Sequence, residues 1–124
     1  MAQQHPIQIL VVEDETLVRF SAADALTDAG FEVVQAEDAG EALAALAGGL
    51  RPFLLFTDVN MPGDTGGIEL AERAFANDPS LRIIITSGLP LARGIGHLPA
   101  RFLPKPYALA ELCQAARGVW PRAH

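Results

Sequence analysis

Five short apolar runs, separated by segments with helical periodicity, limit the fold of this chain more than any other feature. The runs lie at residues 7–12, 31–34, 53–56 and 83–85 and, more weakly, at 101–103. The runs at 53–56 and 83–85 are apolar without alternation, which is typical of strands in a parallel sheet that is covered on both faces. The sequence therefore predicts a parallel five-stranded sheet with helices on both sides.

Apolar residues at helical spacing lie between and after these runs. Two of the stripes stop at glycines, a common C-terminal signal of helices, and another ends before Pro79. Asp38 and Glu41, three residues apart, resemble a capping box at the start of the second stripe. The stripes span residues 18–29, 39–46, 68–75 and 109–119.

Strands and helices that alternate at this length predict a (βα)5 chain. Parallel neighbours joined by right-handed crossovers favour an α/β fold with a flavodoxin-like, doubly wound parallel five-stranded sheet in the order 2-1-3-4-5. Residues 88–99 depart from the pattern because they contain three glycines and two prolines, which disfavour a helix. We therefore expect a short or irregular fourth helix.

Composition narrows the function classes. The 124 residues, half of them apolar, fit one domain spanning residues 1–124 and leave no room for a second. A net charge of -6 without a cluster of Lys and Arg argues against a nucleic-acid partner. The N-terminus does not resemble a secretory signal, and no apolar run approaches the roughly 20 residues that span a bilayer. We expect a cytoplasmic protein that does not insert into a membrane.

Several residues that often carry chemistry favour ordinary structural roles here. Cys113 falls on the last apolar stripe, where we expect a small buried thiol rather than a redox site. His5, His97 and His124 are scattered and have no plausible metal-ligand partner, so we expect surface residues. Tyr107 should open the last helix and pack locally.

Acidic residues follow the strands whose carboxyl ends should meet. In an open α/β sheet, ligands bind beyond the carboxyl ends of the strands. Glu13 and Asp14 follow the first predicted strand, and Asp58 follows the third. Carboxylates held close together have raised pKa values or require a cation. Mg²⁺ is the expected cation, because it prefers hard oxygen ligands and leaves positions open for water and phosphoryl oxygens.

The same edge of the sheet offers groups suited to phosphoryl transfer. An Asp carboxylate can act as a nucleophile and form an aspartyl-phosphate. Lys105 would supply a positive charge, and the Thr86 hydroxyl would supply a hydrogen-bond donor for a phosphoryl oxygen. Catalysis would then consist mainly of positioning and charge neutralisation.

Four segments near the predicted strand ends resemble the signatures of response-regulator receiver domains, the chemotaxis-type receivers of two-component signalling. Their order and spacing span nearly the whole chain. They are VVEDE at residues 11–15, DVNMPG at 58–63 with Gly66 and Gly67 following, ITSG at 85–88, and FLPKP at 102–106.

The resemblance implies a role for each matching residue. Asp58 matches the phosphoacceptor, and Asp14 matches a direct metal ligand. Glu13 matches the second acidic position, which in the family acts mainly through metal-bound water. Asn60 matches the position whose main-chain carbonyl completes the metal shell.

The resemblance also implies a switch. Thr86 matches the hydroxyl that moves toward the phosphoryl group, Lys105 matches the lysine that pairs with it, and Phe102 matches the aromatic switch position. The Lys105–Pro106 bond resembles one that is cis in the family, and cis geometry favours proline.

In such a domain, a histidine kinase or histidine phosphotransfer protein donates the phosphoryl group, and Mg²⁺ is the cofactor. The domain is regulatory rather than an enzyme. Its output is expected through phosphorelay or through a downstream protein that contacts the last strand and helix. Three departures bear on this expectation: Glu13 stands where Asp is more usual, Phe102 lacks a hydroxyl, and the segment 88–99 replaces much of the usual fourth helix.

Other interpretations remain open. The acids at 13–15 alone would suit the first turn of a helix, and Asp58 or Thr86 alone would suit an ordinary strand end. The chain could be a non-phosphorylated interaction module that keeps only the fold. An aspartyl-phosphate phosphatase of the haloacid-dehalogenase type is less favoured, because Asn60 stands where such an enzyme has its general acid. An FMN-binding flavodoxin is least favoured, because acids replace the phosphate loop.

Overall fold

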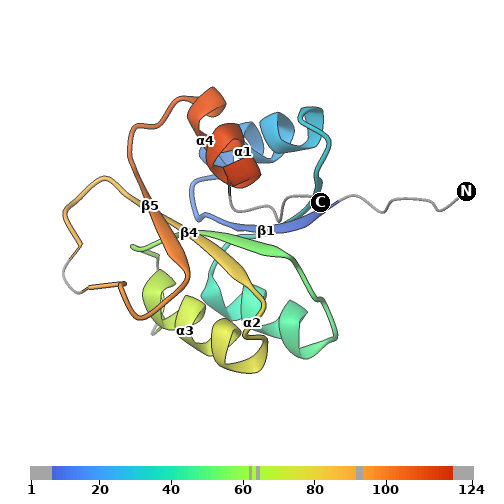
Figure 1. The fold of residues 1–124 in the computed structure, drawn as a ribbon, viewed down its shortest axis with the longest axis vertical. Helices are drawn as coiled ribbons and strands as arrows, with labels where there is room; N and C mark the ends of the chain where they lie inside the picture. The colour runs from blue at the N-terminus through green and yellow to red at the C-terminus, as the bar shows by residue number, and fades with distance from the viewer. Residues whose placement is uncertain (1–6, 62, 64, 92–93, 119–124) are drawn as a thin grey trace, which may run out of the picture.

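The computed structural model describes residues 7–61, 63, 65–91 and 94–118 and contains a parallel five-stranded sheet (Figure 1). The hydrogen-bonded strand order is β2-β1-β3-β4-β5, and every neighbouring pair is parallel. The predicted order is therefore confirmed. The strands are β1 (Gln8–Val12), β2 (Glu32–Ala36), β3 (Leu54–Asp58), β4 (Arg82–Ser87) and β5 (Ala100–Pro104).

Helices cover both faces of the sheet. The helices α1 (Thr16–Asp28) and α4 (Leu109–Gly118) lie together on one face, and α2 (Ala39–Ala47) and α3 (Gly67–Asn77) lie together on the other (Figure 1). The helix α4 follows β5. It therefore corresponds to the last predicted helix, at residues 109–119, and not to the short fourth helix expected at residues 88–99.

The core consists of two apolar layers, one on each face of the sheet. Successive residues of a strand point to opposite faces. In β4, Ile83 and Ile85 pack with the α2 and α3 layer, whereas Ile84 packs with the α1 and α4 layer. This two-sided burial explains why the central strands are apolar without alternation.

The start of α2 follows the predicted capping box closely. Asp38 is the N-cap, and its Oδ1 accepts a hydrogen bond from the Glu41 N–H at 2.8 Å. Glu41 Oε1 accepts a hydrogen bond from the main-chain N–H of Glu37 at 3.1 Å, one residue earlier than in the usual box. At the end of α1, Gly30 has a φ of 102°, a conformation that favours glycine.

The segment between β4 and β5 is more irregular than the sequence suggested. Its described residues, 88–91 and 94–99, contain no helix. Leu98 is buried, and Leu91 and Ile95 pack partly against the α2 and α3 layer. His97 is half-exposed, as expected, but its Nε2 lies 2.7 Å from Glu72 Oε2 of α3. Apolar packing, the contact of His97 with Glu72 and a few isolated hydrogen bonds, such as that from the Leu98 N–H to the Ile95 carbonyl oxygen, hold the described residues of the segment.

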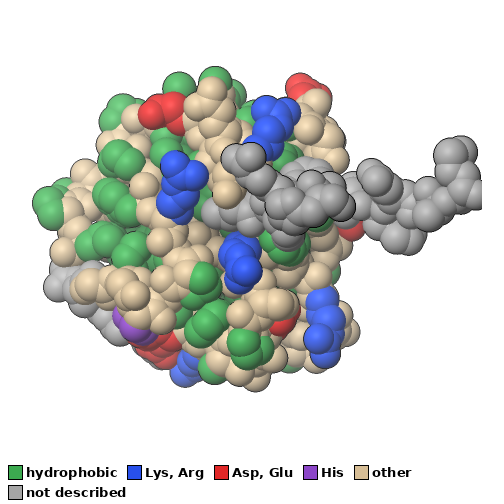
Figure 2. All heavy atoms as spheres, viewed as in Figure 1, with side chains coloured by type: hydrophobic (Ala, Val, Ile, Leu, Met, Phe, Trp, Pro, Cys, Tyr) green, Lys and Arg blue, Asp and Glu red, His purple; other side chains and the backbone are tan. Residues whose placement is uncertain are grey.

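Cys113 is half-buried, and its Sγ lies 3.6 Å from the Ala25 carbonyl oxygen of α1. His5 and His124 lie outside the described residues. None of the helices in the described part of the chain is long and apolar enough to cross a bilayer. On the face seen in Figure 2, the described Lys and Arg side chains are scattered and form no basic patch.

Candidate functional site

The carboxyl ends of four parallel strands bring the predicted site residues to one edge of the sheet. Asp58 ends β3, Glu13 and Asp14 directly follow β1, Thr86 lies near the end of β4, and Lys105 directly follows β5. In the sheet, Asp58 pairs with Thr86. Carboxylate oxygens of the three acids all lie within 4.8 Å of one another.

Lys105 faces two of these acids. Its Nζ lies 2.8 Å from Glu13 Oε1 and 3.0 Å from Asp58 Oδ2. Burial alone would lower the pKa of Lys105, but hydrogen bonds and charge interactions with Glu13 and Asp58 outweigh burial and raise that pKa above its ordinary value. The ammonium group therefore stays charged. The Lys105–Pro106 peptide bond is cis, as expected.

Glu13 is almost completely buried, with 3% of its surface exposed. Burial raises the pKa of Glu13, hydrogen bonds from Lys105 and the Glu15 main chain oppose the rise, and the nearby Asp58 charge adds to it. Glu13 Oε2 accepts a hydrogen bond from the Glu15 N–H at 3.1 Å. Burial of the carboxyl group is the largest cause of the raised pKa.

Asp58 and Asp14 differ in accessibility. Asp58 is buried, and its Oδ1 accepts a hydrogen bond of 3.3 Å from the Asn60 N–H, so Asn60 lies directly beside the acceptor. Asp14 is exposed. The acidic cluster therefore combines two buried carboxylates with one that faces solvent.

Thr86 presents a buried hydroxyl without a partner. Only 1% of its surface is exposed, and its Oγ1 has no hydrogen-bond partner among the described residues. A buried hydroxyl that lacks a partner costs free energy. Because Thr86 lies beside Asp58 in the sheet, this hydroxyl is available to a group attached to that carboxylate.

The chain matches one known family over nearly its whole length. Residues 9–117 match the response regulator receiver domain. The chain belongs to this family. Its acids, hydroxyl and lysine thus lie at the strand ends of a receiver domain of two-component systems.

Known receiver domains share both its sequence and its fold. The chain is 32% identical over 119 residues to the response regulator GacA of Pseudomonas aeruginosa, which covers 92% of this chain and 55% of that protein. A response regulator receiver protein from Sinorhizobium medicae has a TM-score of 0.85 at 26% identity, covering 93% of this chain and 94% of that one. The receiver domain of the hybrid histidine kinase CckA has a TM-score of 0.77 at 33% identity, covering 90% and 97%. The chain spans about half the length of the curated relatives that it matches.

Phe102 lies in β5, at the edge of the receiver sheet. It pairs with Ile85, whereas Thr86 pairs with Leu103, so Phe102 is not the strand neighbour of Thr86. The Phe102 side chain is 39% exposed. The structure therefore places this residue at the surface of the predicted output region rather than within the acidic site.

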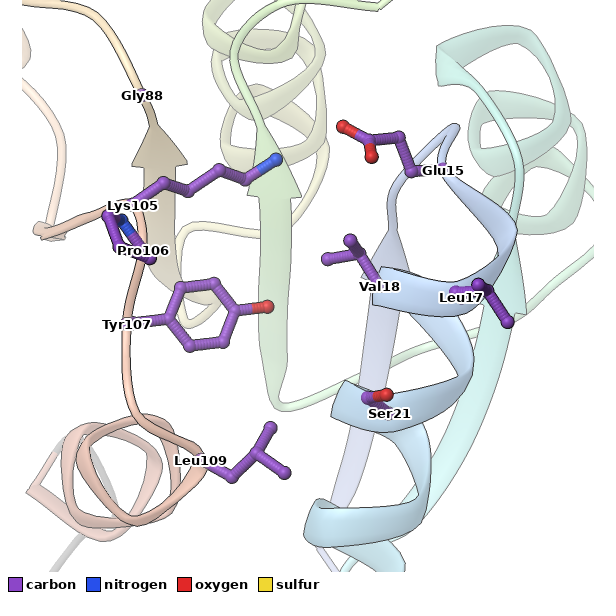
Figure 3. Close-up of a pocket in the computed structure, with 9 residues that line it drawn as sticks. All are labelled: Glu15, Leu17, Val18, Ser21, Gly88, Lys105, Pro106, Tyr107 and Leu109. Carbon is purple, nitrogen blue, oxygen red and sulfur yellow. The ribbon is translucent and has the colours of Figure 1, made fainter.

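A cavity of about 590 Å³ opens beside the receiver site, between α1 and the residues that follow β5 (Figure 3). The Lys105 side chain runs along it toward the acids, and the Tyr107 ring projects into it. Burial, followed by the negative charge of Glu13, raises the pKa of Tyr107 to about 12. Tyr107 lies just before α4 rather than within its first turn, and its ring packs edge-to-face on Phe56 of β3, with ring centroids 5.7 Å apart, so its partner is distant in sequence rather than local as expected. The cavity is lined by Glu15, Leu17, Val18, Ser21, Gly88, Lys105, Pro106, Tyr107 and Leu109.

Two residues that position the site were given no role in the sequence analysis, although Gly67 belongs to one of the segments that resemble the family. Gly67 begins α3 against the main chain of Asp58, where a Cβ would lie 1.9 Å from the Asp58 carbonyl oxygen. Arg19 of α1 is buried, and its Nη1 donates to the Glu13 carbonyl oxygen at 2.9 Å. Arg19 precedes buried Ala22 and Leu26 at helical spacing. This position on an apolar face was the one signal that could have identified it.

Proposed function

We propose that this receiver domain is a phosphorylation-dependent switch that accepts a phosphoryl group on Asp58 with Mg²⁺ as cofactor. One observation carries the proposal: the oxygens of three carboxylates lie within 4.8 Å of one another, and the Lys105 ammonium pairs with two of these carboxylates, those of Glu13 and Asp58. In this proposal the domain regulates other proteins and turns over no small-molecule substrate of its own.

The donor set fits Mg²⁺. Three carboxylates around one ammonium leave an excess of negative charge, and Mg²⁺ favours hard oxygen ligands of this kind. Glu13, Asp14 and Asp58 would hold the ion, together with the main-chain carbonyl of Asn60. The exposure of Asp14 supports the assignment, because Mg²⁺ usually keeps several waters. When bound, the ion neutralises charge on the acids and on phosphoryl oxygens.

In the proposed phosphoryl transfer, Asp58 is the nucleophile and Lys105 stabilises the negative charge. An Asp58 carboxylate oxygen attacks phosphorus, a P–O bond forms, and the P–N bond to the histidine of the donor breaks. Lys105 already lies 3.0 Å from Asp58 Oδ2, so its ammonium can follow charge from the carboxylate to the phosphoryl oxygens.

Phosphorylation would favour a second conformation through Thr86. The added group brings negative charge and acceptor oxygens next to a buried hydroxyl that has no partner among the described residues. Thr86 can therefore gain a hydrogen bond in the phosphorylated state that it lacks otherwise. Such a differential interaction is what shifts a conformational equilibrium.

The surface beside the site supports a protein donor, a histidine kinase or histidine phosphotransfer protein. Leu17 and Leu109 line the cavity between α1 and the residues after β5, and both are exposed, Leu17 by 81%. Lys105 lines the same cavity (Figure 3). A donor that packs on these apolar side chains would bring its phosphohistidine beside Asp58. Output would pass through β5 and α4, where Phe102 is exposed.

Acetyl phosphate and beryllofluoride test the proposal directly. Wild type is incubated with each reagent, with and without Mg²⁺, alongside Asp58→Asn and the matched surface variant Asp24→Asn. After treatment with acetyl phosphate, mass spectrometry should detect a Mg²⁺-dependent phosphoryl adduct in wild type and Asp24→Asn but not in Asp58→Asn, and beryllofluoride should bind with the same dependence on Mg²⁺ and on Asp58. Absence of an adduct in wild type would contradict the proposal and favour the non-phosphorylated interaction module.

A further inference from the structure

Arg19 is a buried cation next to the acidic site that the proposed chemistry does not use. It lies in the first turns of α1, and only 6% of its surface is exposed. A buried charge is costly unless it is well hydrogen-bonded. Its Nη1 donates to the Glu13 carbonyl oxygen at 2.9 Å, its Nε donates to Gln35 Oε1 at 3.2 Å, and its Nη2 lies 4.0 Å from Glu37 Oε1.

The guanidinium group thus holds the main chain of Glu13 rather than its carboxylate. The Glu13 N–H donates to the Ala36 carbonyl oxygen at 3.1 Å. The peptide groups on both sides of the Glu13 Cα are therefore held, one by the end of β2 and the other by Arg19. Asp14 shares the second of these peptide groups, so its Cα is held as well.

This arrangement leaves the acids free to bind a cation. A guanidinium paired with the carboxylates of Glu13 or Asp14 would compete with a metal ion for the same oxygens. Arg19 instead fixes the main-chain positions from which the side chains of Glu13 and Asp14 extend. Gln35 and Glu37, both exposed, orient the guanidinium plane from the end of β2 and the loop after it.

We propose that Arg19 is a positioning residue that sets the Mg²⁺ affinity of the site by fixing the main chain of Glu13 and Asp14 opposite Asp58. This inference rests on the proposed function. Groups that orient metal ligands without touching the metal commonly change metal affinity by about 10-fold or more when they are removed. Arg19 likewise orients the two acids that follow β1, Glu13 and Asp14, through their main chain and without pairing with their carboxylates.

Titration calorimetry with Mg²⁺ tests the inference. Arg19→Met should bind Mg²⁺ about 10-fold more weakly than wild type. Arg19→Lys should recover part of the loss, because an ammonium can still donate one hydrogen bond to the Glu13 carbonyl but cannot also reach Gln35. The matched control is Arg73→Met, which removes an exposed arginine that pairs with Glu69 on α3. It should bind Mg²⁺ as wild type does.

The outcomes separate this inference from the proposed function. Failure of wild type to bind Mg²⁺ would contradict the proposed function itself. Wild-type affinity in Arg19→Met, or an equal loss in Arg73→Met, would overturn the positioning role alone. Urea unfolding without Mg²⁺ shows whether each variant is folded, since a purely structural role would lower stability and leave affinity unchanged. If Arg19→Met does not fold, Gln35→Met should still weaken Mg²⁺ binding, and unchanged affinity there would overturn the inference.

Discussion

At the scale of single residues, two threonines on the adjacent strands β3 and β4 differ in how their hydroxyls are hydrogen-bonded. Thr57 and Thr86 are both buried at the carboxyl ends of central strands. Thr57 Oγ1 donates to the Asp58 carbonyl oxygen at 3.0 Å, whereas Thr86 Oγ1 has no partner among the described residues. The unphosphorylated domain therefore maintains one polar group at a cost in stability, and that cost can be measured.

Replacing each threonine by valine should have opposite effects on stability. Thr86→Val removes a buried hydroxyl without a partner, so the free energy of unfolding should rise by about 1 kcal/mol. Thr57→Val removes a satisfied hydroxyl, so the free energy of unfolding should fall by about 1 kcal/mol. Urea unfolding of both variants measures the difference. A loss of stability in Thr86→Val similar to that in Thr57→Val would indicate that the Thr86 hydroxyl has a partner in solution.

At the scale of elements, α3 begins in direct contact with the strand that carries the phosphoacceptor. The Gly67 N–H donates to the Val59 carbonyl oxygen at 3.0 Å, and the Gly67 Cα faces the Asp58 carbonyl group. Gly67 has no positive φ, so the requirement for glycine here is steric rather than conformational. The start of α3 therefore helps to determine where the Asp58 main chain lies.

Gly67→Ala should be strongly destabilising. Its Cβ would lie 1.9 Å from the Asp58 carbonyl oxygen, so α3 or the end of β3 would have to move. We expect the free energy of unfolding to fall by about 3 kcal/mol, and phosphorylation of Asp58 by acetyl phosphate to slow. Gly94→Ala is the control, because a Cβ there would meet no atom within 4 Å. Urea unfolding compares the two, and equal stability would show that α3 adapts without cost.

The elements were largely predictable from the sequence, because their signals are local. Strands covered on both faces give unbroken apolar runs, and Asp38 with Glu41 marks the start of α2. The absence of a helix at 88–91 and 94–99 was predictable only in part. Glycine and proline indicate irregularity, but the contacts of Leu98 and His97 that hold this segment depend on α2 and α3, which are distant in sequence.

The acidic site was predictable because parallel strands bring their carboxyl ends together. The roles of the residues that support the site, Arg19 and Gly67, were not predictable. Arg19 lies on the apolar face of α1, but its target is a carbonyl group, which every residue has, so the sequence does not show what Arg19 contacts. Gly67 has its role only because α3 approaches Asp58 closely, and that distance does not appear in local sequence.

At the scale of the whole molecule, Tyr107 connects two regions. It packs against the apolar layer of α1 and α4, and it lies beside the acidic edge of the sheet. This residue packs on Phe56 of β3, lines the cavity with Lys105, and is the only tyrosine of the chain. Because its folded pKa of about 12 exceeds the ordinary value of 10, the folded state favours the neutral phenol. Its contribution to stability is complete below pH 10 and is lost as the pH rises toward 12.

Alkaline unfolding should therefore depend on Tyr107. Between about pH 9 and about pH 11 the free energy of unfolding should fall by about 1 kcal/mol through this group, after allowance for its partial exposure. Urea unfolding at the two pH values measures the fall, and phenolate absorbance in folded protein should appear at higher pH than in urea. Tyr107→Phe should make the pH dependence shallower. An equal slope in wild type and Tyr107→Phe would contradict the assignment.

The described residues between β4 and β5, which form no helix, have a consequence for the rate of signalling. An element that must unwind before it moves has to break a series of main-chain hydrogen bonds one after another, which creates an activation barrier. The described residues 88–91 and 94–99 form no helix, so moving them breaks apolar packing and isolated hydrogen bonds rather than a helical series of them. In a switch of the proposed kind, the conformational change of this segment after phosphorylation should therefore be faster than the diffusional encounter of the domain with its downstream protein.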